Sequence, residues 1–107
     1  MTALERLKHQ SMKGRDVTFR NKDRPGRRAR GVVEDEIFEM VNDYKHMMQR
    51  VRFHPGESWD GSTHAYRVCY YTLAADGRTI KFGQYPSFLT QKEAGRLFRK
   101  ARLKGWL

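Results

Sequence analysis

The extended stretch on both sides of Asn42-Asp43 constrains the fold of this chain more than any other sequence feature. GVVEDEIFEMV, residues 31–41, is rich in the β-branched and aromatic residues that favour strands. YKHMMQRVRF, residues 44–53, resumes the extended pattern after a break whose residue types are typical of turns. The sequence therefore predicts a hairpin of two long antiparallel strands, which requires a fold built around a sheet.

Further segments extend this sheet to five strands. DVTFR, residues 16–20, alternates apolar and polar side chains with period two. HAYRVCYYTLA, residues 64–74, is aromatic and apolar on both faces, as expected for a central strand. Asp76-Gly77 suits a type I′ turn, after which residues 78–85 return as the last strand. We predict a five-stranded antiparallel meander over residues 15–85, either a small β-barrel that resembles SH3-like folds in architecture only or a strongly twisted sheet.

A short helix is predicted before the sheet, over residues 1–13, with its end near Lys13-Gly14. Thr2 and Glu5 have the spacing of a capping box, in which each side chain satisfies a backbone N–H group of the other residue. Leu4, Leu7 and Met12 fall near one face of such a helix. The predicted fold class is therefore mainly β with flanking helices, that is, α+β.

A second, amphipathic helix is predicted over residues 90–104. Thr90 and Glu93 have capping-box spacing, and Gly105 follows the last turn. Four apolar residues with helical period give this helix one face for packing: Ala94, Leu97, Phe98 and Ala101. We expect Trp106 to anchor the end of the helix on the sheet.

The length of 107 residues fits one small domain, so we predict a single domain over residues 1–107. Cys69 is the only cysteine, which excludes an internal disulfide and a multi-thiolate zinc site within one chain. No apolar run approaches the roughly 18 residues that a membrane span needs. We therefore expect a soluble, cytoplasmic protein with no membrane partner, no metal and no other cofactor.

The charge of the chain is high and unevenly distributed. The 22 lysines and arginines exceed the 12 acidic residues, which gives a net charge of +10. This net charge is +7 over residues 1–33, −4 over residues 34–60 and +7 over residues 61–107. Scattered solubilising charge would show no such segregation, whereas basic segments attract polyanions. Nucleic acid is therefore the leading class of partner, with DNA and RNA both open.

Two basic segments are the candidate contacts to the sugar-phosphate backbone. RNKDRPGRRARG, residues 20–31, is predicted to be a loop because Pro25-Gly26 is turn chemistry. The polar face of the C-terminal helix is the second segment. The candidate phosphate-binding residues are Arg20, Lys22, Arg24, Arg27, Arg28 and Arg30 in the loop and Lys92, Arg96, Arg99 and Lys100 in the helix. Trp59 and Tyr85 are the candidate exposed aromatics for stacking on bases.

The acidic run Glu34-Asp35-Glu36 falls within the first of the two long strands. Paired carboxylates can hold Mg²⁺, but consecutive strand residues point to opposite faces, so these three cannot converge on one ion without a bulge. We predict instead that Glu34 or Glu36 faces Arg50 or Arg52 across the hairpin. Each exposed pair of this kind contributes under about 1 kcal/mol.

The sequence predicts a small, basic, non-enzymatic module that binds nucleic acid with low sequence specificity, because no base-recognition motif is present. The hypothesis requires the two basic segments to share one surface after folding. One alternative is a protein-interaction or inhibitor module, from a mobile element or a defence system, whose basic surface covers an acidic surface of another protein. A second alternative is a small ribonuclease toxin with candidate residues Glu39, His46, Arg50 and Arg52. The oligomeric state stays open.

Overall fold

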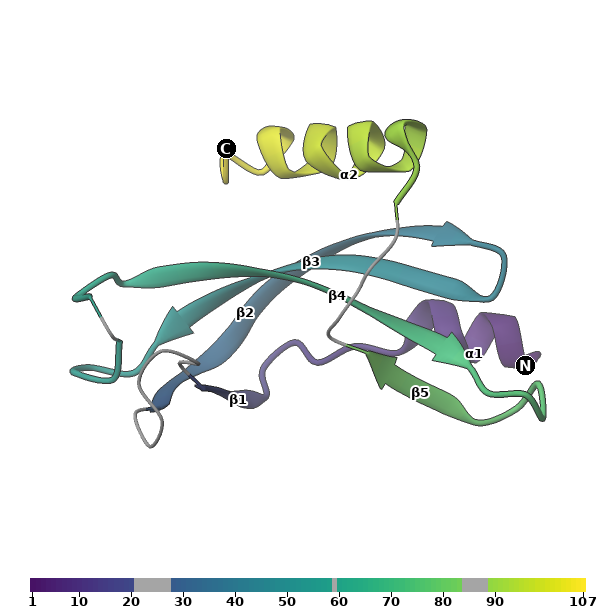
Figure 1. The fold of residues 1–107 in the computed structure, drawn as a ribbon, viewed down its shortest axis with the longest axis horizontal. Helices are drawn as coiled ribbons and strands as arrows, with labels where there is room; N and C mark the ends of the chain where they lie inside the picture. Colours follow the sequence, from purple (N-terminus) through teal and green to yellow (C-terminus); the bar gives the residue numbers. More distant parts are fainter. Residues whose placement is uncertain (21–27, 59, 84–88) are drawn as a thin grey trace. The chain divides into compact units, whose positions relative to one another are not determined.

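The computed structural model describes residues 1–20, 28–58, 60–83 and 89–107 (Figure 1). Its elements follow the chain in the order α1 (Ala3–His9), β1 (Asp16–Arg20), β2 (Arg28–Val41), β3 (Tyr44–Phe53), β4 (His64–Leu73), β5 (Ile80–Gly83) and α2 (Gln91–Leu103). The five strands form one antiparallel sheet in sequence order. The predicted five-stranded meander with flanking helices is therefore confirmed. Among the described residues no ladder joins β1 to β5, so these two are the edge strands of the sheet.

The chain divides into two compact units. The helical unit comprises Met1–Ser11, Ile37–Met48 and Val68–Leu107, and it includes both helices and β5. The strand unit comprises Met12–Glu36 and Gln49–Arg67, and it includes β1. The strands β2, β3 and β4 each supply residues to both units. That the chain forms a single domain stays a prediction.

The apolar core of the helical unit forms where α2 packs on β2 and β3. Leu97 and Ala101 of α2 are fully buried in one cluster with Ile37 of β2 and Met48 of β3. Trp106 belongs to the same cluster and is only 8% exposed. The predicted anchoring of the helix end by this tryptophan is thus confirmed.

The predicted capping box determines where α2 begins. Thr90 Oγ1 accepts the backbone N–H of Glu93 at 3.4 Å, and Glu93 Oε2 accepts the backbone N–H of Thr90 at 2.8 Å. These bonds satisfy donors that the first turn of a helix leaves unpaired. The buried face of α2 is narrower than the apolar period predicts, because Phe98 is 48% exposed.

The first helix is shorter than predicted, because α1 ends at His9. Lys45 of β3 stabilises this end. Its buried Nζ donates to the carbonyl oxygens of Lys8 at 2.7 Å and of Gln10 at 2.5 Å. An ammonium group placed there satisfies carbonyl groups that would otherwise need a capping motif.

The predicted N-cap of α1 is confirmed, since Thr2 Oγ1 accepts the backbone N–H of Glu5 at 3.1 Å. The predicted apolar face is correct only for Leu7, which is buried. Leu4 is largely exposed, and Met12 lies beyond the helix and packs in the strand unit. The prediction of one shared face is wrong because a helix of two turns is too short to include all three residues.

The strand unit has an apolar core of its own. Val17 of β1, Val33 of β2 and Val51 of β3 form a buried cluster, against which Met12 and Phe19 pack. This arrangement confirms the predicted inward face of the first strand. In each unit, the core therefore consists of apolar side chains that the periodicity of a strand or a helix directs to the same face of that element.

A buried polar chain lies in the strand unit and links β2, β3 and β4. The fully buried Gln49 donates from Nε2 to Glu36 Oε2 at 2.6 Å. Arg67 donates to Gln49 Oε1 from Nε at 2.9 Å and from Nη2 at 2.6 Å. Both ends of the buried amide are thus hydrogen-bonded, which offsets the cost of removing it from water.

Gly31 allows β2 to lie close to β3. A Cβ atom at this position would lie 2.7 Å from the carbonyl oxygen of Arg52 and 2.8 Å from Cγ1 of Val51. Non-bonded carbon contacts are favourable only at roughly 3.5–4.0 Å. The position therefore has no room for a side chain.

The predicted loop over residues 20–31 is too long, because β2 already begins at Arg28. β1 pairs with this part of β2 in the register Arg20↔Arg28. Ala29 is buried, whereas Arg28 and Arg30 are exposed. Pairing with β1 therefore extends the strand into a segment that local composition assigned to a loop, and the arginines follow strand alternation.

The connection between β4 and β5 also differs from its prediction. It spans residues 74–79, rather than the two residues of a type I′ turn. Asp76 Oδ1 accepts the backbone N–H groups of Arg78 and Thr79, both at 2.8 Å. The side chain thereby closes a longer loop, and the hydrogen bonds from Thr79 and then Arg78 lower the pKa of Asp76 to about 2.

β4 is well buried on one face only. Cys69 and Tyr71 are buried, whereas Tyr66 and Val68 are partly exposed at 42% and 39%. The prediction of a central strand covered on both faces is therefore wrong for the second face. An antiparallel sheet allows this because only one of its faces needs to be covered.

Candidate functional site

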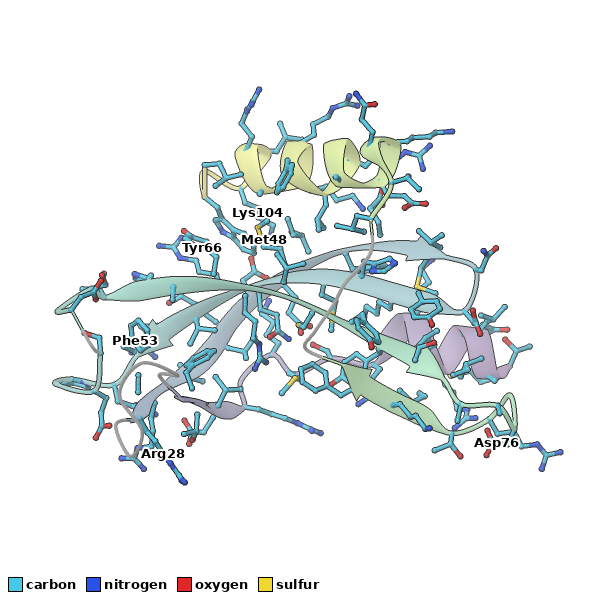
Figure 2. All side chains as sticks on the ribbon, viewed as in Figure 1. Arg28, Met48, Phe53, Tyr66, Asp76 and Lys104 are labelled. Carbon is cyan, nitrogen blue, oxygen red and sulfur yellow. The ribbon has the colours of Figure 1, made fainter. Side chains whose placement is uncertain are left out.

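The outer face of α2 concentrates cations of the helical unit. Lys92, Arg96 and Arg99 are four and three residues apart, so they lie on one face of the helix. The buried Leu97 and Ala101 occupy the other face. Figure 2 shows nitrogen-tipped side chains along the exposed side of α2. The helix therefore packs with its apolar side and presents these cations to solvent.

Glu39 of β2 pairs with two cations of α2. Lys100 Nζ lies 2.7 Å from Glu39 Oε2 and also donates to the carbonyl oxygen of Phe38 at 2.5 Å. Arg96 Nε lies 3.8 Å from Glu39 Oε1. The Glu39 side chain is only 16% exposed, so solvent screens these pairs less than pairs at an open surface. Lys100, one of the predicted phosphate-binding residues, thus also attaches α2 to β2.

Three other cations of α2 have no such partner. The side chains of Lys92, Arg99 and Arg102 are exposed and form no ion pair or hydrogen bond with the described residues. A cation without an acidic neighbour keeps its full attraction for an anionic ligand. These three residues, with Arg96, form the part of α2 that is available to a polyanion.

The first predicted basic segment belongs to the strand unit. Arg28 and Arg30 are exposed on β2, and Arg30 Nη2 lies 3.4 Å from Glu57 Oε1. Three predicted phosphate contacts lie outside the described residues, namely Lys22, Arg24 and Arg27, and so do the two predicted stacking residues, Trp59 and Tyr85. Of Arg20, only the main chain is described, within β1. That this segment and α2 share one surface stays a prediction.

The predicted pairing of the acidic run is confirmed at Glu34. Its carboxylate lies 3.3 Å from Nε of Arg50, 3.4 Å from Nε of Arg52 and 3.5 Å from Nε2 of His64. Glu36 instead belongs to the polar chain of the strand unit. Within the described ranges, no group of three or more His, Cys, Asp or Glu side chains is placed to hold a metal ion.

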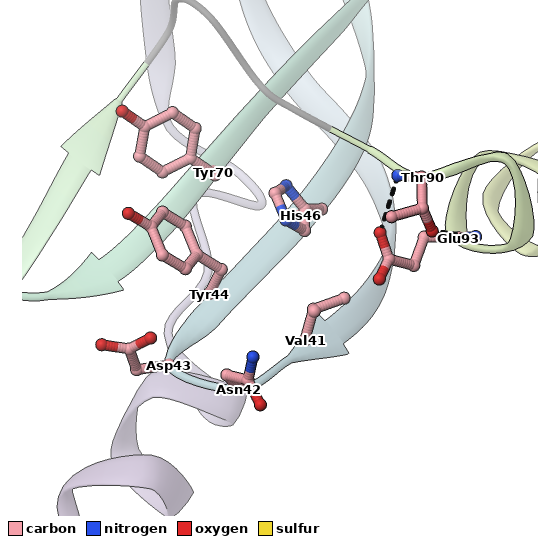
Figure 3. A pocket seen from close by; sticks show the side chains of 8 residues that line it. All are labelled: Val41, Asn42, Asp43, Tyr44, His46, Tyr70, Thr90 and Glu93. Atoms are coloured by element: carbon pink, nitrogen blue, oxygen red, sulfur yellow. Dashed lines mark hydrogen bonds between the residues drawn. The ribbon is translucent and has the colours of Figure 1, made fainter.

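A pocket of about 320 Å³ lies beside the start of α2 in the helical unit, and no sequence pattern predicted it (Figure 3). Tyr44 and His46 come from β3, Tyr70 from β4 and Glu93 from the first turn of α2. The complete lining is Val41, Asn42, Asp43, Tyr44, His46, Tyr70, Thr90 and Glu93. The i, i+2 spacing of Tyr44 and His46 on one strand face was the only local indication of it.

Aromatic rings form one side of this pocket. The rings of Tyr44 and His46 are nearly parallel, with centroids 5.7 Å apart and an interplanar angle of 9°. The ring of Tyr70 is tilted by 55° to that of Tyr44, with centroids 5.6 Å apart. Gly83 pairs with Tyr70 across the β4-β5 ladder, and its missing side chain leaves the space that the Tyr70 ring fills.

The surroundings lower the pKa of two ionisable groups of the pocket, His46 and Glu93, for different reasons. Burial lowers the pKa of His46, an effect that the nearby Glu93 carboxylate partly opposes. The hydrogen bonds from Thr90 lower the pKa of Glu93, and the charges of His46 and Arg96 add to this effect. At neutral pH the pocket therefore contains a carboxylate and a largely neutral imidazole. Figure 3 shows His46 between the two tyrosines and the Thr90-Glu93 pair.

The residues of the ribonuclease alternative have different surroundings. His46 lines the pocket, whereas Glu39 binds cations of α2, both within the helical unit. Arg50 and Arg52 belong to the strand unit and pair there with Glu34. Arg50 and Arg52, two of the four candidate residues, are thus paired with Glu34 in the strand unit. Cleavage of RNA stays a prediction to be tested.

No helix formed by the described residues is long and apolar enough to cross a membrane. No protein-family model, curated protein or solved structure matches this chain. What the protein does is therefore inferred from its own side chains and their geometry.

Proposed function

We propose that the protein is a non-enzymatic module that binds the sugar-phosphate backbone of nucleic acid with low sequence specificity. The observation that supports this function best is the row of Lys92, Arg96 and Arg99 on the outer face of α2. The ends of the row are seven positions apart, which corresponds to about 10 Å along a helix axis. A row of this length can face more than one phosphate of a strand.

The pairing pattern of α2 favours a phosphate ligand. Lys92, Arg99 and Arg102 have no acidic partner in the part of the chain that the structure describes, so binding an anion breaks no internal ion pair. Each cation that neutralises a phosphate releases a condensed counterion. Three such contacts give a slope of log affinity against log salt of about −2 to −3.

The composition of this face favours a polyanion over an acidic protein. Interfaces between proteins have an apolar centre surrounded by polar residues. α2 exposes two large apolar residues, Phe98 and Leu103, which are five positions apart and therefore not on one face of the helix, so they form no apolar centre. A backbone of repeated phosphates needs no apolar centre, because charge provides most of its affinity.

The test compares two triple variants that remove equal charge from the helical unit. The first is Lys92→Gln, Arg99→Gln, Arg102→Gln, and the matched control is Lys8→Gln, Arg78→Gln, Lys81→Gln, which are exposed cations outside α2. Fluorescence anisotropy measures affinity for duplex and single-stranded oligonucleotides from low to moderate salt. We expect the first variant to reduce the salt slope by about 2, and the control to keep it.

Five results would contradict the proposal. A flat salt response of the parent protein, or no binding at low salt, would overturn it. Equal loss in both triple variants would mean that general charge, and not α2, binds the nucleic acid. A stoichiometric protein that co-purifies without nucleic acid would favour the protein-interaction alternative, and RNA cleavage that His46→Ala abolishes would favour the ribonuclease.

A further inference from the structure

We propose that the pocket beside α2 binds one unpaired guanine base of a nucleic-acid strand whose phosphates lie on the outer face of α2. The base would stack on the face of Tyr44 that is turned away from His46 and donate its N1–H and N2–H₂ groups to the carboxylate of Asp43. This inference rests on the proposed function, and it adds a base preference and a requirement for single-stranded nucleic acid.

The size and the rings of the pocket suit a nucleobase. Its volume of about 320 Å³ lies at the lower end of the range for small-molecule sites. Tyr44 is 40% exposed, and its ring is already packed against His46 on one side. A base therefore stacks on the remaining face of Tyr44, with the tilted Tyr70 ring as a second wall.

The polar groups of the pocket select the base. Asp43 and Glu93 provide carboxylates, and no lysine or arginine is among the lining residues that the structure describes. Thr90 donates hydrogen bonds to the Glu93 carboxylate, whereas the described residues donate none to the Asp43 side chain. The pocket thus offers acceptors to a ligand that supplies donors.

Guanine is the base whose pairing edge has two adjacent donors, N1–H and N2–H₂, that one carboxylate can accept together. Adenine and cytosine place a ring nitrogen acceptor next to their amino group, which a second carboxylate oxygen would repel. Because this edge is occupied in a duplex, only an unpaired guanine can present it.

The charges around the pocket match a nucleotide. Lys92 and Arg96 lie on α2 on either side of Glu93 in sequence, and Arg96 is close enough to lower the pKa of that carboxylate. Carboxylates therefore line the pocket while cations follow on the same helix. A nucleotide has an uncharged base with donors and an anionic phosphate, so each part meets a complementary group. A methylated ammonium ligand would suit the rings and carboxylates, but the cations of α2 and the net charge of +10 repel it.

The experiment measures anisotropy of short labelled oligothymidylates that contain one central guanine, inosine or adenine. We expect the guanine strand to bind about tenfold more tightly than the adenine strand. Inosine lacks the N2 amino group and should lose most of this preference. Annealing the guanine strand to its complement should abolish the preference while leaving salt-dependent binding.

Pocket variants locate the preference. Tyr44→Ala should weaken binding of the guanine strand by about tenfold, whereas Tyr66→Ala, which removes an exposed tyrosine outside the pocket, should not. Glu93→Gln keeps an acceptor for the capping box, and Asp43→Asn keeps the side-chain shape. Asp43→Asn should remove the discrimination between guanine and inosine and Glu93→Gln should keep it, with circular dichroism confirming that each variant is folded.

The outcomes separate this inference from the proposed function. Salt-dependent binding that is equal for all three strands and unchanged by Tyr44→Ala would overturn the guanine site and leave the proposed function intact. Absence of binding to every strand would overturn both. Perturbation of the Tyr44 ring resonances by a trimethyllysine peptide, and not by the guanine strand, would assign the pocket to a cationic ligand and overturn the inference.

Discussion

Glu39 of the helical unit and Glu34 of the strand unit are each a centre of ion pairs, but they leave different sets of cations available. Glu34 pairs with both arginines opposite it on β3, Arg50 and Arg52. Glu39 pairs with Lys100 and, at 3.8 Å, with Arg96. α2 retains further exposed cations without acidic partners, whereas the strand unit also pairs other cations internally, through Lys13–Asp35 and Arg30–Glu57.

This difference shows that local net charge does not identify a binding surface. Residues 1–33 and 61–107 have the same net charge of +7. Each segment has cations paired with acids, Lys13 and Arg30 in the first and Arg96 and Lys100 in the second. The second segment differs because exposed cations without such a pair, Lys92, Arg99 and Arg102, follow one another on a single helix. The quantity that matters for an anionic ligand is the number of cations it can neutralise without breaking a pair, because a broken pair reduces the gain.

The largest expected effect tests whether the two units unfold together or independently. Leu97→Ala in the helical unit should lower the free energy of unfolding by about 2–5 kcal/mol, and Val51→Ala in the strand unit by about 2 kcal/mol, since both side chains are fully buried. Because β2, β3 and β4 supply both units, both variants should shift one common urea transition. Two transitions, each sensitive to one variant, would contradict this. Leu103→Ala, at an exposed site, is the control.

The next effect compares a glycine from each unit. Gly31→Ala places Cβ against the backbone carbonyl of Arg52, which cannot turn away, so we expect a loss of about 1–3 kcal/mol. Gly83→Ala meets only the outer ring atoms of Tyr70, which can move. The second variant should therefore lose less stability in urea unfolding but change the near-UV circular dichroism of the tyrosines. Equal losses would mean that the Tyr70 ring is fixed as firmly as the backbone.

A smaller effect sharpens the comparison of the two glutamates. Glu39→Gln should lower the free energy of unfolding by about 1 kcal/mol and Glu34→Gln by less, since the Glu39 side chain is 16% exposed and that of Glu34 is 38% exposed. Glu39→Gln should strengthen binding to nucleic acid although it lowers stability, because it releases Lys100 and Arg96 next to the proposed phosphate site. Anisotropy titrations at low salt should show tighter binding for Glu39→Gln, and weaker binding would contradict the assignment of α2.

The smallest effect is the pH dependence from His46. Burial lowers its pKa in the folded state, so the unfolded chain binds this proton more tightly. The stability that the neutral imidazole provides is present above its unfolded pKa of about 6.5, and is lost as the pH falls from there through the lower folded pKa. Urea unfolding at several pH values between 7 and 5 measures this effect. The free energy of unfolding should depend less on pH in His46→Gln than in the parent, whereas substitution of the exposed His9 by Gln should leave the dependence unchanged. An unchanged profile in His46→Gln would contradict this origin.

Local patterns predicted the elements whose determinants lie close together in sequence. The turn at Asn42-Asp43, the capping box of Thr90 and Glu93 and the pairing of Glu34 across the hairpin all depend on residues within one element or one hairpin. Period and capping chemistry are sufficient to identify such features. The anchoring of Trp106 followed from its place at the end of an amphipathic helix.

Features that depend on distant residues could not be predicted in this way. The end of α1 depends on Lys45, and the pocket combines Tyr44 with Tyr70 and Glu93 from two other elements. The connection after β4 was mispredicted for a different reason, since the Asp76 side chain can accept backbone N–H groups and so replaces the turn that Asp-Gly favours. Sequence period gives the face of a residue but not the element that comes to lie against it.

The contact between Lys45 and the end of α1 has a consequence for synthesis of the chain. A helix of seven residues is marginal in isolation, and here the group that stabilises its last carbonyls is translated more than thirty residues later. A nascent chain that has not yet released β3 from the ribosome thus has an α1 segment without a stable helix. Because β3 follows α1 in synthesis, α1 is completed only after the central hairpin has emerged.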